Sequence, residues 1–168
     1  MTTHPYDILT LPDNGCLIFT PCPGTKGVDL ANSIRELRQA GAEAVITMMT
    51  DDELDKFEVS SLPEVVQQSR MVWFQFPVED DAAPAKAFEQ SWQAQKNEVL
   101  SLVRQGKCVA IHCRGGSGRT GFMAAVIMRE MGMDEMQTTT LVQGLRPNSL
   151  KFPAHSDYLA ANYDTKSN

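Results

Sequence analysis

The sequence feature that most constrains the fold of this chain is a short apolar stretch. It leads directly into a glycine-rich turn and then into a helical pattern. Residues 107–112 are typical of a buried strand, and residues 119–131 are typical of a helix that ends before Gly132. The turn between them, residues 113–118, contains three glycines. A strand followed by such a turn and a helix predicts a sheet with parallel pairs, in which a ligand binds beyond the carboxyl end of the strand.

Apolar stretches alternate with helical patterns along the rest of the chain. We predict further strands at residues 16–19, 44–49 and 71–78, and helices that begin near Asp29, Ser61, Pro84, Asp134 and Pro153. Asp29 and Asp134 are expected to be N-caps, and Ser61 with Glu64 is expected to form a capping box. The predicted fold is one α/β domain over residues 1–168, with a mostly parallel sheet flanked by helices on both faces. Residues 1–15 and 163–168 are expected to be peripheral tails.

The composition excludes several classes of function. The 168 residues carry a net charge of −6, which disfavours DNA, RNA and anionic membranes as partners. Apolar runs are short compared with the roughly 20 residues of a membrane span. The first seven residues do not resemble a signal peptide, so we expect a cytoplasmic protein. The spacing of the cysteines predicts neither a zinc site nor a disulfide framework, and Cys16, Cys22 and Cys108 are expected to be small apolar fillers.

The turn has the length and composition of a phosphate-binding loop. Five residues separate Cys113 from Arg119, so the loop can curl around a tetrahedral anion. Its backbone N–H groups can point inward as an anion nest, and the following helix adds its positive N-terminal end. Gly115, Gly116 and Gly118 are expected to take backbone angles that a side chain would oppose. The residues predicted to bind phosphate are Arg114, Gly115, Gly116, Ser117, Gly118 and Arg119.

Four side chains around this loop suit phosphoryl transfer. Thiols at helix N-termini beside cations ionise readily, so Cys113 is the expected nucleophile. Arg119 offers a planar fork of donors that matches two phosphoryl oxygens. Thr120 is placed to donate its hydroxyl to the sulfur, and His112 is expected to bond the loop backbone and to fix its shape. This chemistry requires no metal and no cofactor.

An ester also needs an acid that protonates the leaving oxygen. Glu79, Asp80 and Asp81 follow a predicted strand and belong on the same rim as the loop. A second acidic run at residues 51–55 follows the strand 44–49, and we interpret it mostly as a solvated loop and helix start. The residues alone leave the choice among these carboxylates open.

Residues 112–121 match the HCxxGxxR[ST]G signature of the cysteine-based protein tyrosine and dual-specificity phosphatases. Residues 77–80 look like the general-acid loop of that family. Residues 21–24, 35–37, 50–54 and 145–146 resemble the branch that contains the cyclin-dependent kinase-associated phosphatase. In total the resemblance covers about residues 17–160.

The resemblance implies a mechanism with two steps and no metal. Cys113 would form a phosphocysteine while Asp80 protonates the departing alcohol, and Asp80 would then act as a base when water hydrolyses the intermediate. Asp81 is the runner-up acid, because it replaces the glycine that commonly follows the acid in the family, and a shift of the register by one residue would exchange it with Asp80. The implied substrate is a phosphorylated protein or peptide.

Some family features are missing. The tyrosine-recognition loop and the glutamine-bearing loop that positions water are not evident, and Gln143, Asn148 and Lys151 are weak substitutes. Met49 stands where some relatives carry a cysteine that pairs with the nucleophile.

Three other functions stay open on the sequence. Arg114 follows the nucleophile directly, as a basic residue often does in inositol-lipid phosphatases, so a phosphoinositide or inositol phosphate is an alternative substrate. A rhodanese-like sulfurtransferase also uses a cysteine loop, but it needs neither an acid loop nor Thr120. A silent phospho-binding module would not need all three of Cys113, Arg119 and an acid.

Overall fold

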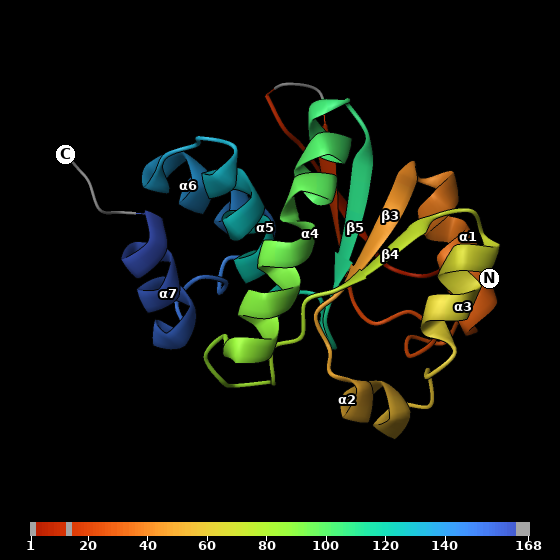
Figure 1. Ribbon diagram of the computed structural model, residues 1–168. Coiled ribbons are helices and arrows are strands. Elements are labelled where there is room, and N and C mark those ends of the chain that lie inside the picture. The colour runs from red at the N-terminus through yellow and green to blue at the C-terminus, as the bar shows by residue number, and fades with distance from the viewer. Residues whose placement is uncertain (1–2, 13–14, 164–168) are drawn as a thin grey trace.

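A computed structural model describes residues 3–12 and 15–163 (Figure 1). The elements of this part of the chain are, in order, β1 (Asp7–Thr10), β2 (Cys16–Thr20), α1 (Leu30–Gln39), β3 (Ala42–Thr47), α2 (Asp51–Lys56), α3 (Leu62–Gln68), β4 (Val72–Gln75), α4 (Lys86–Arg104), β5 (Cys108–His112), α5 (Gly118–Glu130), α6 (Glu135–Leu145) and α7 (Pro153–Tyr163).

The strands form one sheet in the order β1-β2-β5-β3-β4. β1 is antiparallel to β2, and the other neighbouring pairs are parallel. β5 is central, and its last residue, His112, pairs with Thr20 of β2 on one side and with Thr47 of β3 on the other. The carboxyl ends of these three strands therefore meet at one edge of the sheet, and Cys113 follows directly at that edge.

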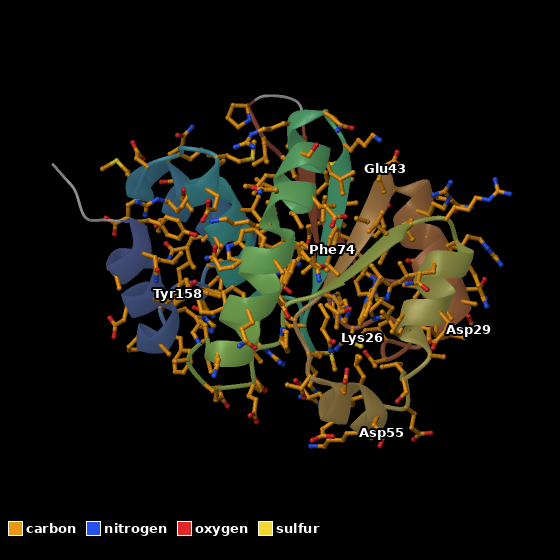
Figure 2. The ribbon with its side chains drawn as sticks, in the orientation of Figure 1. Lys26, Asp29, Glu43, Asp55, Phe74 and Tyr158 are labelled. Carbon is orange, nitrogen blue, oxygen red and sulfur yellow. A yellow bond between two sulfur atoms is a disulfide. The ribbon has the colours of Figure 1, made fainter. Side chains whose placement is uncertain are left out.

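Helices cover both faces of the sheet (Figure 1). α4, α5, α6 and α7 lie on one side, α1 and α3 lie on the other, and α2 lies beyond the ends of the strands. Successive residues of a strand point to opposite faces, so Val109 and Ile111 of β5 belong to the core under α4 and α5, and Ala110 belongs to the core under α1 and α3. Figure 2 shows Phe74 in the interior beside α4 and Glu43 at the surface. The predicted fold class is confirmed.

Two of the three predicted helix caps are present. The side chains of Asp29 and Asp134 accept hydrogen bonds from the backbone N–H groups of Asn32 and Gln137, at 2.7 and 2.8 Å. The capping box at Ser61 is wrong, because Ser61 has φ −83° and ψ 4° and makes no side-chain cap bond. A capping serine takes extended backbone. α3 forms nevertheless, because its Leu62 and Val66 are buried.

The structure contains a strand where the sequence predicts only a tail. β1 pairs with β2 at the edge of the sheet, and among its residues only Leu9 is buried. One buried residue in a four-residue strand is too little signal for a prediction from sequence. Of the predicted C-terminal tail, residues 164–168 lie outside the described residues.

The prediction that Cys16 and Cys108 are separate apolar fillers is wrong. They form a disulfide between β2 and β5, where the parallel register places them directly opposite each other with their Cα atoms 4.4 Å apart. The two residues are 92 positions apart in the chain, so only the strand pairing brings them together. None of the helices in the described part of the chain is long and apolar enough to span a membrane.

Candidate active site

Cys113 stands at the carboxyl end of the central strand, and only 3% of its surface is exposed. Its Sγ accepts hydrogen bonds from the backbone N–H of Gly116 and from the hydroxyl of Thr120, both at 3.3 Å. Both donors point at the sulfur. The structure thus places Thr120 where the sequence analysis expects it.

Of the three glycines in the loop, Gly116 is the one that the geometry requires. Its φ is +81°, and a Cβ built on it would lie 2.6 Å from the backbone atoms of Pro21 and Thr20. Gly115 and Gly118 do not take left-handed backbone, and a Cβ at either position would meet nothing within 4 Å. The expectation that all three glycines supply unusual backbone angles is therefore wrong for two of them.

The loop is braced from the side of α6. Arg146 donates from Nε to the carbonyl of Gly116 at 2.9 Å and from Nη1 to the carboxylate of Asp7 at 2.8 Å. The Ser149 hydroxyl donates to the carbonyl of Ser117 at 3.1 Å. Arg146 belongs to a segment that carries the family resemblance, but its contact with the loop is not readable from the sequence.

Arg119 lies in the first turn of α5, and its side chain is 3% exposed. Its Nη1 and Nη2 donate to the two carboxylate oxygens of Glu53, at 2.6 and 2.9 Å, and Nη1 also donates to the carbonyl of Val78 at 2.9 Å. Burial alone would lower the pKa of Arg119, but the hydrogen bonds and charge of Glu53, with the charges of Cys113 and Asp80, outweigh it and raise that pKa. The guanidinium is therefore a permanent cation at the loop.

Glu53 is the functional residue that the sequence analysis missed. It was interpreted as part of a solvated acidic run, and its neighbours Asp51, Asp52 and Asp55 are indeed exposed. Glu53 differs because α2 begins after Thr50, whose hydroxyl accepts the Glu53 N–H at 3.2 Å. This cap sets the start of α2 and so the face on which Glu53 lies. Nothing in the spacing of four carboxylates singles out the one that turns inward.

The acid candidates occupy the loop after β4. Asp80 is 62% exposed, and its Oδ1 lies 3.7 Å from Nη2 of Arg119. Asp81 is exposed and has φ +59°, in the left-handed region that favours glycine. Val78, two residues before Asp80, donates its N–H to the carbonyl of Met48 at 3.0 Å. The loop is thus tied to the chain that follows β3, with Asp80 beside the guanidinium of Arg119.

His112 ends β5 and is completely buried. One ring nitrogen hydrogen-bonds the Thr47 hydroxyl at 2.7 Å, and the other lies 3.2 Å from the carbonyl of Cys113. The indole N–H of Trp73 also donates to Thr47, at 2.8 Å. Burial lowers the pKa of His112 to about 4, despite the bond to Cys113. His112 is therefore neutral and holds the loop backbone, which is the supporting role expected of it.

Arg114 is exposed, and its guanidinium lies 4.9 Å from the centre of the Phe57 ring. A cavity of about 390 Å³ opens at this place, between α2, the acid loop and Arg114, and is lined in part by Phe57, Glu79 and Asp80.

Cys22 is buried next to the loop, and its N–H donates to the carbonyl of Arg114 at 3.0 Å. Burial, followed by the charges of Cys113 and Glu53, raises the pKa of Cys22 to about 12. Cys22 is therefore an uncharged thiol. Among the described residues, no cluster of three or more His, Cys, Asp or Glu side chains is placed to hold a metal ion.

A cysteine with donors aimed at its sulfur and a buried arginine six residues later, between a central strand and a helix, define a cysteine-dependent phosphatase. The model of the family described as the DSP-PTPase phosphatase of polymorphic toxin systems matches residues 24–133, more than half of the chain. The chain belongs to this family of cysteine-based dual-specificity and tyrosine phosphatases, and within it resembles the cyclin-dependent kinase-associated branch.

Individual proteins agree with the family assignment. Cyclin-dependent kinase inhibitor 3 of the rat is 27% identical over 128 residues, which are 74% of this chain and 58% of the rat protein. The human protein of the same name is 27% identical over 110 residues, 63% of this chain and 50% of its own length. The chain thus covers between half and three fifths of the length of these relatives.

Two solved structures have the same fold. Kinase-associated phosphatase with its catalytic cysteine replaced by serine matches with a TM-score of 0.83 and 20% identity, over 99% of both chains. Tk-PTP in its active form matches with a TM-score of 0.71 and 21% identity, over 95% of this chain and 97% of its own.

Proposed function

We propose that this protein hydrolyses phosphomonoesters on proteins through a phosphocysteine on Cys113. The observation that carries the proposal is the arrangement at one sulfur: Sγ receives hydrogen bonds from Gly116 and Thr120, inside a loop that ends in the buried cation of Arg119. A thiolate held in this way is a nucleophile that needs no separate base.

In the first step the Cys113 thiolate attacks the phosphorus and the bond to the ester oxygen breaks. Asp80 gives its proton to that oxygen, which leaves as the alcohol. Arg119 and the loop N–H groups meet the charge that develops on the phosphoryl oxygens, so the route uses no metal and no cofactor. In the second step water attacks the phosphorus, Asp80 takes a proton from it, and Cys113 departs as the thiolate with the Thr120 hydroxyl directed at its sulfur. The product is inorganic phosphate.

A phosphorylated protein or peptide is the substrate class that we favour. The cavity between α2, the acid loop and Arg114 is lined by three carboxylates, those of Glu53, Glu79 and Asp80, and by two cations, those of Lys56 and Arg114. It therefore offers no surplus of positive charge to the additional phosphates of an inositol polyphosphate. Arg114, which suggested such substrates, lies over Phe57. The similarity to kinase-associated phosphatase also supports a phosphoprotein substrate.

Two variants test the covalent route. Cys113→Ser should abolish turnover and retain phosphate binding, because the loop amides and Arg119 remain. Arg119→Ala should weaken both, because the bidentate contact is lost. Turnover above about one percent in Cys113→Ser would overturn the covalent route, since removal of the nucleophile of a covalent mechanism costs far more than that. An activity panel of phosphotyrosine, phosphothreonine and phosphoserine peptides, phosphoinositides and thiosulfate would assign the substrate class.

We also propose a cytoplasmic location, in agreement with the sequence analysis. The disulfide between Cys16 and Cys108 weighs against it, because disulfides are rare in reducing compartments. Alkylation of free thiols in freshly lysed cells, followed by mass spectrometry, decides this point. If Cys16 and Cys108 are fully oxidised, the protein resides in an oxidising compartment.

A further inference from the structure

Two carbonyl groups of the glycine-rich loop, residues 113–118, bind donors that lie outside the loop. The carbonyl of Arg114 accepts from the backbone N–H of Cys22 at 3.0 Å. The carbonyl of Gly116 accepts from Nε of Arg146 at 2.9 Å. Because both donors belong to other segments of the chain, both carbonyls point outward from the loop.

An outward carbonyl turns the next N–H group inward. A trans peptide unit holds its C=O and its N–H in opposite directions, and the peptide bonds of the described residues are trans. The Arg114 carbonyl shares a unit with the N–H of Gly115, and the Gly116 carbonyl shares one with the N–H of Ser117. Both N–H groups therefore point into the loop, where the Gly116 N–H meets the Sγ of Cys113 at 3.3 Å. In the part of the chain that the structure describes, neither of them donates to an acceptor.

This arrangement of the loop amides needs outside support. N–H groups that converge on one space repel one another, because each hydrogen carries a partial positive charge, and an anion relieves the repulsion only when it binds. Gly116 lies at φ +81°, and glycine leaves a peptide unit free to rotate away from such a position. Donors outside the loop hold the amides in place beforehand, and such preorganisation makes backbone N–H groups effective against developing charge.

Of the two outside donors, Arg146 is the one that donates from its side chain. It is the C-cap residue of α6, and its side chain is 17% exposed. Its Nη1 donates to the carboxylate of Asp7 at 2.8 Å and to the carbonyl of Leu145 at 3.0 Å. Its guanidinium lies 5.6 Å from the centre of the Phe19 ring, and Phe19 of β2 pairs with Asp7 of β1. These three contacts fix the direction in which Nε donates.

We propose that Arg146 is a positioning residue of the phosphate site. Its Nε holds the Gly116 carbonyl outward and thereby aims the Ser117 N–H at a phosphoryl oxygen. Asp7 holds the guanidinium in the orientation that this contact requires. Arg146 acts through the loop backbone and not through contact with the phosphoryl group. This inference rests on the proposed function, and it gives β1, which the sequence predicts only as part of a tail, a role in the site.

Three variants separate this role from packing and from charge. Arg146→Met keeps an unbranched side chain over Phe19 and removes the donors. Arg146→Lys keeps the positive charge and one donor group. Arg104→Met is the matched control, because it removes an exposed guanidinium from the last turn of α4, at the end of the sheet where β5 begins. Thermal melts show which variants fold.

The readout is the NMR chemical shift of two loop amide protons during a titration with inorganic phosphate. In the wild-type protein the amide protons of Gly115 and Ser117 should both move downfield, because each donates to a phosphate oxygen. In Arg146→Met the shift of Ser117 should be mostly lost. The shift of Gly115 should remain, because the Cys22 N–H still holds the Arg114 carbonyl. A change that is confined to one peptide unit is not expected from a general loss of stability.

Affinity and turnover should follow the amide shift. Arg146→Met should raise the dissociation constant of phosphate and lower kcat/KM for p-nitrophenyl phosphate about tenfold each, roughly the value of one hydrogen bond to a charged group. Arg146→Lys should recover part of this loss. Asp7→Ala should weaken phosphate binding about threefold, since its carboxylate is 54% exposed and such ion pairs are weak. Arg104→Met should change neither quantity.

An undiminished Ser117 shift in Arg146→Met would overturn the role of Arg146, and so would an equal loss of the Ser117 and Gly115 shifts in a folded variant. If neither amide of the wild-type protein responds to phosphate, the proposed function itself is wrong. If Arg146→Met does not fold, Asp7→Ala decides in the same titration. A smaller shift of Ser117 than in the wild type supports the inference, and an unchanged shift overturns it.

Discussion

Glu53 and Arg119 stand 66 residues apart in the chain, and each carboxylate oxygen of Glu53 accepts from a different terminal nitrogen of Arg119, at 2.6 and 2.9 Å. With the bond to the Val78 carbonyl, three of the five guanidinium N–H donors are occupied. The remaining donors, on Nε and Nη2, form the side of the fork that is left for two phosphoryl oxygens. Glu53 and the Val78 carbonyl thus fix the orientation of the Arg119 guanidinium.

The first prediction concerns this pair. Glu53→Gln should lower kcat/KM about 10- to 100-fold, because Arg119 loses its charged partner and its fixed orientation. It should also destabilise the fold by about 3 kcal/mol, because a nearly buried cation is left unpaired. A fixed concentration of phosphate should raise the melting temperature of the variant less than that of the wild type, because phosphate binds the misoriented Arg119 more weakly. Asp52→Asn, on the same helix and exposed, is the control and should change neither quantity.

The second prediction distinguishes Asp80 from Asp81. Asp80→Asn should lower turnover of alkyl phosphates by about 10²–10⁴-fold, since the leaving oxygen loses its acid. A leaving group that needs no proton should be affected far less, and the basic limb of the pH–rate profile should flatten. Asp81→Asn should stay near wild type. If Asp81→Asn shows the loss and Asp80→Asn does not, Asp81 is the acid. If neither variant loses activity, the acid is another residue.

The third prediction uses the contrast between two adjacent glycines. Gly116→Ala should lower activity by about 100-fold or more, because a Cβ at φ +81° would press on the backbone of Thr20 and Pro21 and shift the loop. Gly115→Ala should keep most of the activity, because its Cβ enters open space. Turnover and phosphate affinity of the two variants measure this difference, and equal losses would contradict the described loop.

The fourth prediction concerns stability against pH. Burial lowers the pKa of both His112 and His155 to about 4, from 6.5 for the free side chain, so the unfolded chain binds more protons between these values. Their contribution to stability is complete above about pH 6.5 and is lost as the pH falls toward 4, by on the order of 3 kcal/mol for His112. Urea unfolding at pH 7 and pH 5 measures the loss. His155→Phe should show a smaller loss, and an equal one would mean that His155 is not neutralised by burial.

The fifth prediction concerns the disulfide. Reduction of the bond between Cys16 and Cys108, which closes a loop of 92 residues, should lower the free energy of unfolding by at most about 4–5 kcal/mol. Urea unfolding with and without reductant measures this change. The double variant Cys16→Ala/Cys108→Ala should be insensitive to reductant, and reductant should not lower the activity of either protein.

The sequence by itself determined the order of the elements from β2 onward and the residues of the glycine-rich loop. Residues 107–121 carry strand, turn and helix within fifteen positions, and the Thr120 hydroxyl reaches the sulfur of Cys113 across only seven positions. The caps at Asp29 and Asp134 are equally local, because each side chain bonds a residue three positions away. Interactions of this range leave a pattern that can be read directly.

The tertiary structure decided everything that depends on distant pairs. Three contacts join segments that no spacing rule connects. They are the ion pair of Glu53 with Arg119, the disulfide between Cys16 and Cys108, and the stack of His155 on Phe122. Which carboxylate turns toward Arg119 follows from the start of α2, and which cysteines meet follows from the register of β2 and β5. Such contacts are set by how the sheet and its helices pack, and packing depends on the whole chain at once.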